Sequence, residues 1–317
     1  MGNIRYFDKD AIHFVSNRCE HEMFLLLPQK RINELIVFWL AKAMDRYGSG
    51  IRIYALIFMC NHFHILLQDT LGQLPQFMGY FQGNLARAIN DEIGRGGSFW
   101  YREYDDVIVD GEEEFWNRYA YTVLNPVKSG LVATAGQWRG LSSLGFALEN
   151  KPLKITGINR TKYNDAMRFG KRANPKDYEE TYSFKVSTPP MLQGKTRARQ
   201  NSFITELLKG AAQKYKKDRL YKPALGMRRV MKQRFTNRPK SPSQRPRFKF
   251  FCMDRERLKE LKGSYNGFVA RYRECMAMLF DRAQQTTRPN RRAPSYRNPI
   301  PWPPGCFPPT CHVPVTG

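Results

Sequence analysis

The chain has 317 residues, with 52 Lys and Arg against 28 Asp and Glu and a formal net charge of +24. Residues 1–150 sum to −3 and residues 151–317 to +27. Such a basic excess indicates a polyanionic partner, nucleic acid above all, because phosphates release condensed counterions when cations bind them. The N-terminus is polar, and the apolar runs are too short to span a bilayer. The six cysteines form no C-x-x-C pair. We therefore expect a cytoplasmic protein rather than a secreted or membrane protein.

The first half of the chain alternates strand and helix patterns. The first predicted helix ends at Gly48-Ser49-Gly50. The third predicted helix ends near Asn125, because Pro126 disfavours helical geometry at the residue before it. This order, β-α-β-β-α-β-α, predicts an α+β fold with an antiparallel sheet and helices on one face. The expected elements are a strand at 10–18, a helix at 29–47, a strand hairpin at 51–60 and 62–68, a helix at 73–94, a strand at 104–109 and a helix after 110.

An acidic cluster, Asp110-Gly111-Glu112-Glu113-Glu114, opens the third helix. Asp110 is a good N-cap, and Glu113 occupies the position of a capping-box carboxylate. Capping and the helix dipole therefore explain the cluster, and we do not expect a metal site there.

Beyond about residue 150 the composition becomes polar, basic and rich in proline. We expect a catalytic domain at 1–148, a basic linker at 149–198, a basic helical extension at 199–285 and a disordered tail at 286–317. Helices are predicted at 201–216, 226–235 and 254–284. The last one has a heptad-like apolar seam, which favours packing on the 201–216 helix, or alternatively a dimer seam.

The strand at 62–68 begins with His62-Phe63-His64. Successive strand residues point to opposite faces, so the two imidazoles share one face and Phe63 takes the other. Two imidazoles so placed can hold one divalent metal ion. The alternative, which this triplet alone favours, is a pair of histidines on the solvent side of an ordinary strand.

On the third helix, Tyr121 and Asn125 are four residues apart and therefore share a face. Tyr119 is two residues from Tyr121 and points roughly away, so Tyr121 is the tyrosine aligned with Asn125. Taken singly, Tyr121 can be a core or interface tyrosine and Asn125 a helix-terminal residue.

The segments CNHFHILLQ, LARAIN, GSFWYREYDD and YTVLNPVKSGLV, followed by Trp138 and Ser142-Ser143, resemble the REP-associated tyrosine transposases. These are relatives of the HUH single-tyrosine transposases, and the likeness covers roughly residues 8–148. It implies a ferredoxin-like sheet. Two features depart from the family: Cys60 stands where relatives commonly carry proline, and the basic extension is longer than in compact members.

The resemblance implies metal-dependent cleavage and rejoining of single-stranded DNA next to hairpins, such as REP-like elements, through a 5′-phosphotyrosine intermediate. Tyr121 matches the nucleophile, His62 and His64 the metal-binding histidines, and Asn125 a third, polar ligand. We expect Mg²⁺ or Mn²⁺ as the cofactor. Mg²⁺ usually prefers oxygen ligands, so Mn²⁺ should serve as well or better with two imidazoles. The acting unit is a monomer or a homodimer.

Basic residues outside this motif are candidate DNA contacts. Arg245, Arg247 and Lys249 alternate with aromatic residues, a composition that binds backbone and stacks bases of single strands. The equal alternative is an apolar strand of a small second core, with Arg and Lys on its solvated face. Arg102 and Lys128 lie within the segments that resemble the family. Competing functions are a catalytically silent DNA-binding protein and a hydrolytic metallonuclease.

Overall fold

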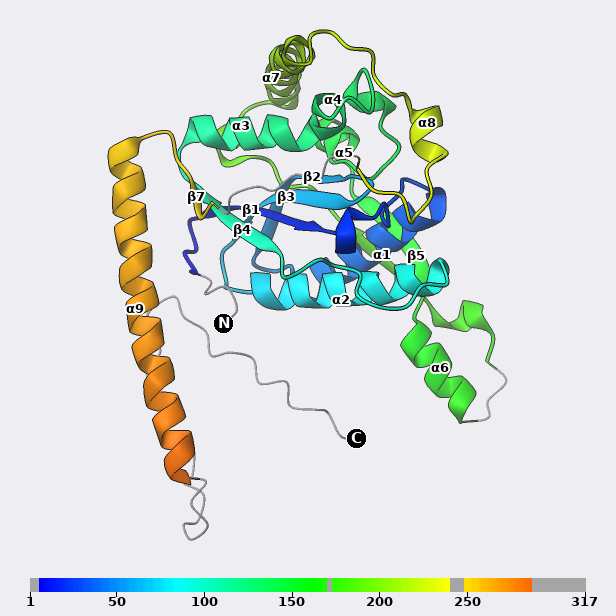
Figure 1. The fold of residues 1–317 in the computed structure, drawn as a ribbon. Helices are drawn as coiled ribbons and strands as arrows, with labels where there is room; N and C mark the ends of the chain where they lie inside the picture. The colour runs from blue at the N-terminus through cyan, green and yellow to red at the C-terminus, as the bar shows by residue number, and fades with distance from the viewer. Residues whose placement is uncertain (1–5, 170–172, 240–247, 287–317) are drawn as a thin grey trace.

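The structure is a computed structural model that describes residues 6–169, 173–239 and 248–286 (Figure 1). The strands are β1 (Ile12–Arg18), β2 (Ile51–Phe58), β3 (His62–Asp69), β4 (Asp105–Val109), β5 (Leu153–Ile158), β6 (Glu179–Phe184) and β7 (Phe250–Phe251). The α-helices are α1 (Lys30–Tyr47), α2 (Leu74–Glu92), α3 (Glu112–Val123), α4 (Asn125–Lys128), α5 (Leu144–Glu149), α6 (Arg160–Arg168), α7 (Arg197–Asp218), α8 (Met227–Met231) and α9 (Arg255–Thr286).

Five strands form the main sheet in the order β2-β3-β1-β4-β7. The neighbours β2 and β3, β3 and β1, and β1 and β4 are antiparallel, whereas β7 is parallel to β4. The α+β class is therefore confirmed. The sheet is mixed rather than purely antiparallel, because two residues from far along the chain add to its β4 edge.

Helices cover both faces of the sheet, so the expectation of helices on one face is wrong (Figure 1). Phe63, Ile65 and Leu67 of β3 belong to the apolar layer under α1 and α2, and Leu66 belongs to the layer under α3 and α7. The reason lies in β2, where seven of the eight residues are buried. A strand that is apolar along its whole length needs cover on both sides.

The segment expected as a linker instead contains the antiparallel hairpin of β5 and β6, which packs on α1. The Phe38 ring of α1 lies 5.6 Å from that of Tyr182, and Lys42 Nζ lies 3.4 Å from Glu180 Oε2. Gly157 lets the hairpin approach, because a Cβ there would lie 2.7 Å from the Phe38 ring. The hairpin is buried along one side only, which leaves few apolar clusters in its sequence.

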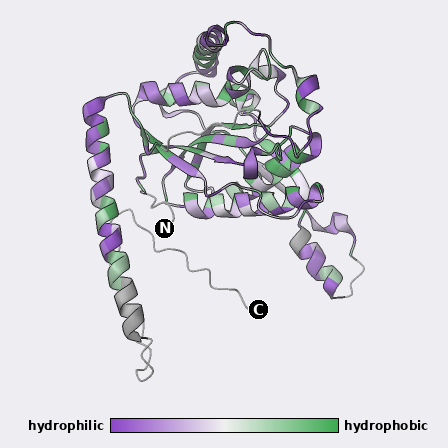
Figure 2. Ribbon diagram, viewed as in Figure 1, coloured by the Kyte–Doolittle hydropathy of each residue, from purple (hydrophilic) through white to green (hydrophobic). Residues whose placement is uncertain are grey.

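The three late helices form near their expected positions but do not pack together as expected. Ile204 and Leu208 of α7 are buried in the α3 layer, and Phe203 lies 4.8 Å from Trp116 of α3. The helix α9 instead contacts β7 at the edge of the sheet, and hydrophilic turns alternate with apolar ones along it (Figure 2). Because α3 occupies the apolar side of α7, α9 cannot pack there. The alternative role of the apolar seam of α9, as a dimer contact, stays a prediction.

The start of α3 differs from the expected cap. Its N-cap is Gly111, at φ 92°, and no side chain caps the helix. Asp110 instead has its Oδ2 3.5 Å from Arg257 Nε of α9, and its backbone N–H donates to Phe251 O. Gly111 can adopt a positive φ because it has no Cβ. Asp110 does not cap the helix because β7 and α9 hold it instead. No helix in the described ranges is both long and apolar enough to span a bilayer.

A buried ion pair between β1 and β4 gives stability a pH dependence. His13 Nδ1 lies 2.9 Å from Asp106 Oδ1, and His13 is 2% exposed. Burial lowers the pKa of His13, but the Asp106 carboxylate, with Asp69 and Asp8, outweighs it and raises the pKa. A raised histidine pKa stabilises the fold below the unfolded pKa of about 6.5, and this contribution is lost as pH rises through the folded pKa.

We therefore expect His13→Gln to lower the free energy of unfolding more at about pH 5.5 than at about pH 8.5. Urea titrations of both chains at the two pH values measure this difference. An equal loss at both values would mean that His13 is not charged in the folded chain.

Candidate active site

The two histidines at the start of β3 lie side by side on the face that α3 covers. Their ring centroids are 5.0 Å apart, and the rings are inclined by 72°. His64 is 7% exposed and stacks on Phe14 of β1 at 5.0 Å. Phe63, between them, is fully buried on the opposite face. Strand alternation thus places both imidazoles at one spot and anchors them through the core behind.

Asn61 orients His62. Its Oδ1 lies 2.7 Å from His62 Nδ1, and its Nδ2 donates to Glu22 O at 3.1 Å. Because an amide oxygen only accepts, Nδ1 carries the proton and Nε2 has the lone pair that a metal requires. The hairpin turn that contains Cys60 is closed by the hydrogen bond from Met59 N to His62 O at 2.8 Å.

Tyr121 of α3 lies against this pair. Its ring centroid is 5.3 Å from that of His64 and 5.9 Å from that of Phe14, both nearly edge-on. Tyr119 points into the protein, is 1% exposed and packs 5.6 Å from Trp116. Burial raises the pKa of the Tyr119 phenol well above its ordinary value. The half-buried Tyr121 is therefore the tyrosine beside the imidazoles, and Tyr119 is a poor nucleophile because burial disfavours its charged form.

Asn125 is the first residue of α4 and is 3% exposed. The helix α3 ends at Val123, two residues earlier than expected, since Pro126 has no N–H to donate and sits instead in the first turn of α4, where none is needed. Ser129 Oγ donates to Asn125 Oδ1 at 3.2 Å. This bond fixes the amide, whose oxygen has a second lone pair.

The donor set at this place fits a divalent cation of intermediate softness. It consists of two adjacent imidazoles, one with its tautomer fixed by Asn61. The buried amide of Asn125 lies at the start of α4, directly after the helix that carries Tyr121. Within the described ranges, no group of three or more His, Cys, Asp or Glu can hold a metal ion. An imidazole pair with an amide oxygen is a ligand set that suits Mn²⁺ at least as well as Mg²⁺, so the role of Asn125 as a third ligand stays a prediction.

Positive charge covers the Tyr121 ring. Lys128 Nζ of α4 lies 4.3 Å from its centroid and 5.6 Å from that of Tyr215 of α7. Arg118 Cζ lies 5.8 Å from the same ring. Burial raises the pKa of Tyr215, and the nearby Tyr121 adds to the shift. Neither Asn61 nor Tyr215 was expected at this site. The apolar spacing of α7 indicated a packed helix, but the partner expected for it was the 254–284 helix rather than α3.

The other candidate DNA contacts are dispersed. Arg102 donates to both carboxylate oxygens of Asp105, at 3.1 and 2.8 Å, on the surface. Lys249 O accepts from Ile108 N at 3.0 Å, and the two residues after it form a strand of the main sheet rather than of a small second core. DNA binding by Lys249 stays a prediction. Arg245 and Arg247 lie outside the described residues.

Fold and site together define an α+β protein with two imidazoles and a phenol assembled between β3 and α3. No protein-family model matches the sequence, and no curated protein matches it. Among solved structures, a REP-associated tyrosine transposase bound to a REP hairpin is similar, with 15% identity and a TM-score of 0.39 over 47% of this chain and 86% of that one. A putative transposase from Deinococcus radiodurans R1 has 17% identity and a TM-score of 0.27 over 36% of this chain and 89% of that one.

Proposed function

We propose that this chain is a DNA strand transferase that cleaves and rejoins single-stranded DNA next to hairpins, with a divalent metal ion and a covalent 5′-phosphotyrosine at Tyr121. The observation that carries the proposal is the 5.3 Å separation between the rings of Tyr121 and His64, from elements far apart in the chain. The net charge of +24 supports a nucleic-acid substrate. The β-α-β-β-α-β order supports a ferredoxin-like catalytic domain, and we assign the activity to the cytoplasm.

In the proposed reaction, Tyr121 Oη attacks the phosphorus of a backbone phosphodiester. A bond forms between Oη and phosphorus, the bond from phosphorus to the 3′ oxygen breaks, and the phenol proton leaves while the 3′ oxygen gains one. The phosphotyrosine keeps the free energy of the phosphodiester, so a free 3′-hydroxyl reverses the step without ATP. The same residue thereby cuts one strand and joins another.

His62, His64 and Asn125 would hold the metal ion, which supplies positive charge to the phosphate as charge builds up at phosphorus. The chain prepares the site around it. Asn61 fixes the tautomer of His62, Phe14 stacks on His64, and Ser129 holds the Asn125 amide. Side chains held in this way lose little freedom when substrate binds.

One experiment tests the proposal against its two competitors. A labelled, hairpin-containing single strand is incubated with the full chain and Mn²⁺ or Mg²⁺ and run on a denaturing gel. A covalent, SDS-resistant band is the expected result. Cleavage without such a band would mean hydrolysis, and binding without either product would mean a catalytically silent DNA-binding protein.

Lys128 is expected to position the Tyr121 ring. Its ammonium lies over the ring at 4.3 Å, Lys128 is exposed, and a cation–π contact at an exposed site contributes about 0.5–1 kcal/mol. Lys128→Met should therefore slow adduct formation by about two- to fivefold. Lys128→Arg, which keeps the charge, should retain most of the rate, and the exposed Lys176→Met is the matched control. Equal rates for Lys128→Met and wild type would remove Lys128 from the site.

A further inference from the structure

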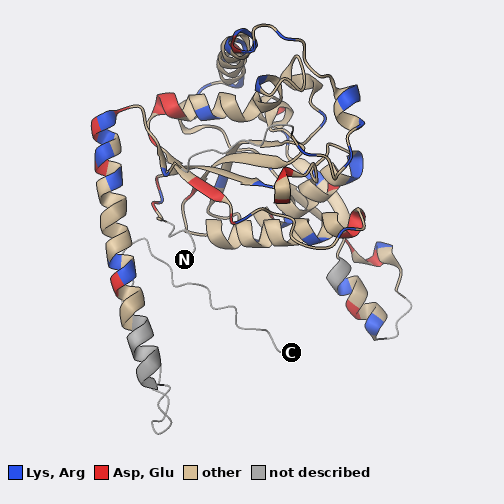
Figure 3. Cartoon of the chain, in the orientation of Figure 1, with Lys and Arg blue, Asp and Glu red and all other residues tan. Residues whose placement is uncertain are grey.

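Residues 195–238 carry the greatest concentration of positive charge described. They hold fourteen Lys and Arg against two acidic residues, a net +12 that is half of the chain's +24. Figure 3 shows Lys and Arg on α7 and α8. We call the exposed members of this set the basic surface: Lys195, Arg199, Lys209, Lys214, Lys217, Lys222, Arg228, Arg229, Lys232, Arg234 and Arg238. No salt bridge within the described ranges engages any of them.

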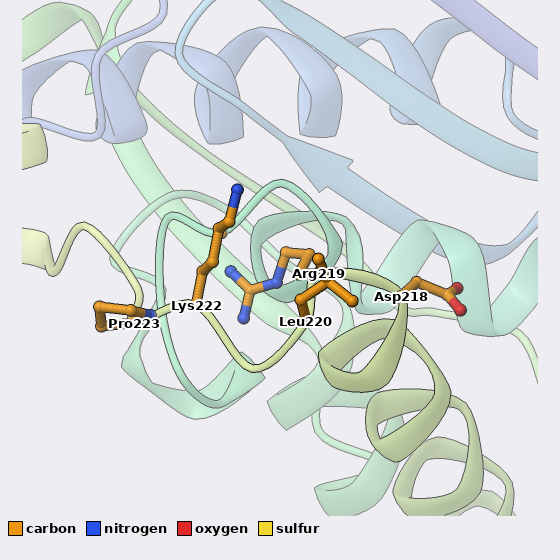
Figure 4. Close-up of a pocket in the computed structure, with 6 residues that line it drawn as sticks. Asp218, Arg219, Leu220, Lys222 and Pro223 are labelled. Atoms are coloured by element: carbon orange, nitrogen blue, oxygen red, sulfur yellow. The ribbon is translucent and has the colours of Figure 1, made fainter.

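A pocket of about 360 Å³ lies at the end of α7, against the basic surface. Arg219 and Lys222 line it, together with Gly130, Asp218, Leu220 and Pro223. In Figure 4 the Arg219 guanidinium extends toward Lys222, while the Asp218 carboxylate points the other way. Two cations are thus directed to one side of a recess that is large enough for part of a nucleotide.

The turn beside this pocket presents two apolar side chains to solvent. Leu220 and Tyr221 both have positive φ, 50° and 54°, which is unfavourable for residues with a Cβ. Their side chains are 78% and 74% exposed. Hydrogen bonds from Leu220 N to Lys217 O and from Tyr221 N to Lys216 O hold the turn. A strained turn that exposes an aromatic ring among cations is typical of a binding element.

The turn adjoins the proposed active site through α4. Gly130, at φ 70°, lies under Arg219, because a Cβ there would be 2.4 Å from Arg219 Nη1. Gly130 O and Leu131 O accept from Leu225 N and Gly226 N, which fastens the segment after the turn to the loop after α4. Two residues before Gly130, Lys128 lies over the Tyr121 ring. The pocket is therefore connected, through Gly130 and the two residues before it, to the lysine that covers the Tyr121 ring.

We propose that the turn at residues 219–222 binds one unstacked nucleotide of the strand that is cleaved at Tyr121, with a phosphate between Arg219 and Lys222 and the base on the Tyr221 ring. The basic surface continues the path of the backbone along α7 and α8. Cations that follow a backbone, with an aromatic ring for a base, are the means by which proteins hold single strands without reading sequence. That the strand is the one cleaved rests on the proposed function.

Binding to an oligothymidylate of about 20 nucleotides tests this, measured by fluorescence anisotropy with the full chain carrying Tyr121→Phe. Tyr221→Ala should raise Kd by at least about fivefold, whereas Tyr221→Phe, which keeps the stacking ring, should stay within about twofold. Lys222→Gln should reduce the slope of log K against log salt by about 0.7, the value of one phosphate contact on a single strand. Phe169→Ala removes an equally exposed aromatic and should change nothing.

A Tyr221→Ala chain that binds within twofold of its parent, or a Tyr221→Phe chain as weak as Tyr221→Ala, would overturn the proposal. A second measurement uses a blunt DNA duplex of the same length. If Tyr221→Ala lost as much affinity for this duplex as for the single strand, the proposal would also be overturned, because paired bases cannot stack on the ring. Since Tyr121→Phe forms no adduct, binding and chemistry are separated. An absent adduct in the wild-type chain contradicts the proposed function, whereas unchanged binding in the variants contradicts this site alone.

Discussion

Tyr121→Phe should abolish the SDS-resistant adduct with a labelled, hairpin-containing strand, and Tyr119→Phe should leave it in place. The change at Tyr121 removes one oxygen, the atom proposed to bond with phosphorus, and leaves the ring that packs 5.3 Å from His64. Loss of a nucleophile cannot be offset by neighbouring groups, so we expect a rate at least about 10³-fold lower. A denaturing gel over time measures it.

The control variants separate chemistry from folding. Tyr119 is fully buried with a raised pKa, so Tyr119→Phe tests the other tyrosine of the same helix without touching the imidazoles. Tyr215→Phe tests the phenol that shares Lys128 with Tyr121. If the adduct disappeared with Tyr119→Phe and persisted with Tyr121→Phe, the nucleophile would have to be reassigned to a buried residue and the proposed geometry would be wrong.

His64→Ala should remove both Mn²⁺ binding and adduct formation. With two imidazoles and one amide as the proposed ligands, loss of a buried imidazole leaves a set that lacks the strength to hold the ion. Titration calorimetry with Mn²⁺ in the absence of DNA gives a readout that does not depend on activity. We expect binding to weaken beyond detection in His64→Ala and by about 10–100-fold in Asn61→Ala, which only orients His62.

His21→Ala is the matched control for this experiment, because His21 is exposed on a short helical turn near Asn61. It should bind Mn²⁺ as the wild type does. Unchanged affinity in His64→Ala would show that the ion binds elsewhere, and the role of the paired histidines would then be confined to packing against Phe14.

Local patterns predicted the part of the fold that depends on near neighbours. The helical spacing of α1 and α2 and the apolar run of β2 gave elements within a few residues of those in the structure. The two-residue alternation of β3 was enough to place His62 and His64 together on one face. The relation between Tyr121 and those histidines came from the family resemblance rather than from periodicity, since nothing local relates α3 to β3.

Features that depend on distant contacts were not predictable in this way. The two residues of β7 are too few to give a periodic signal, and they form a strand because the β4 edge offers unpaired backbone groups. Asn61 could be recognised only once its amide was seen to bond both His62 and Glu22 O. One face of the β5–β6 hairpin is exposed to solvent, so its amino-acid composition resembles that of a loop and did not indicate strands.

The strand β7 has a consequence for how the molecule is made. Ribosomes deliver a chain from its N-terminus, so β4 is synthesised long before residues 250 and 251 arrive to pair with Ile108 and Val109. Through that interval the nascent protein keeps an open row of peptide groups, and such rows recruit strands from other chains. A chain shortened to end before β7 would leave these peptide groups of β4 unpaired permanently, and it would be expected to aggregate.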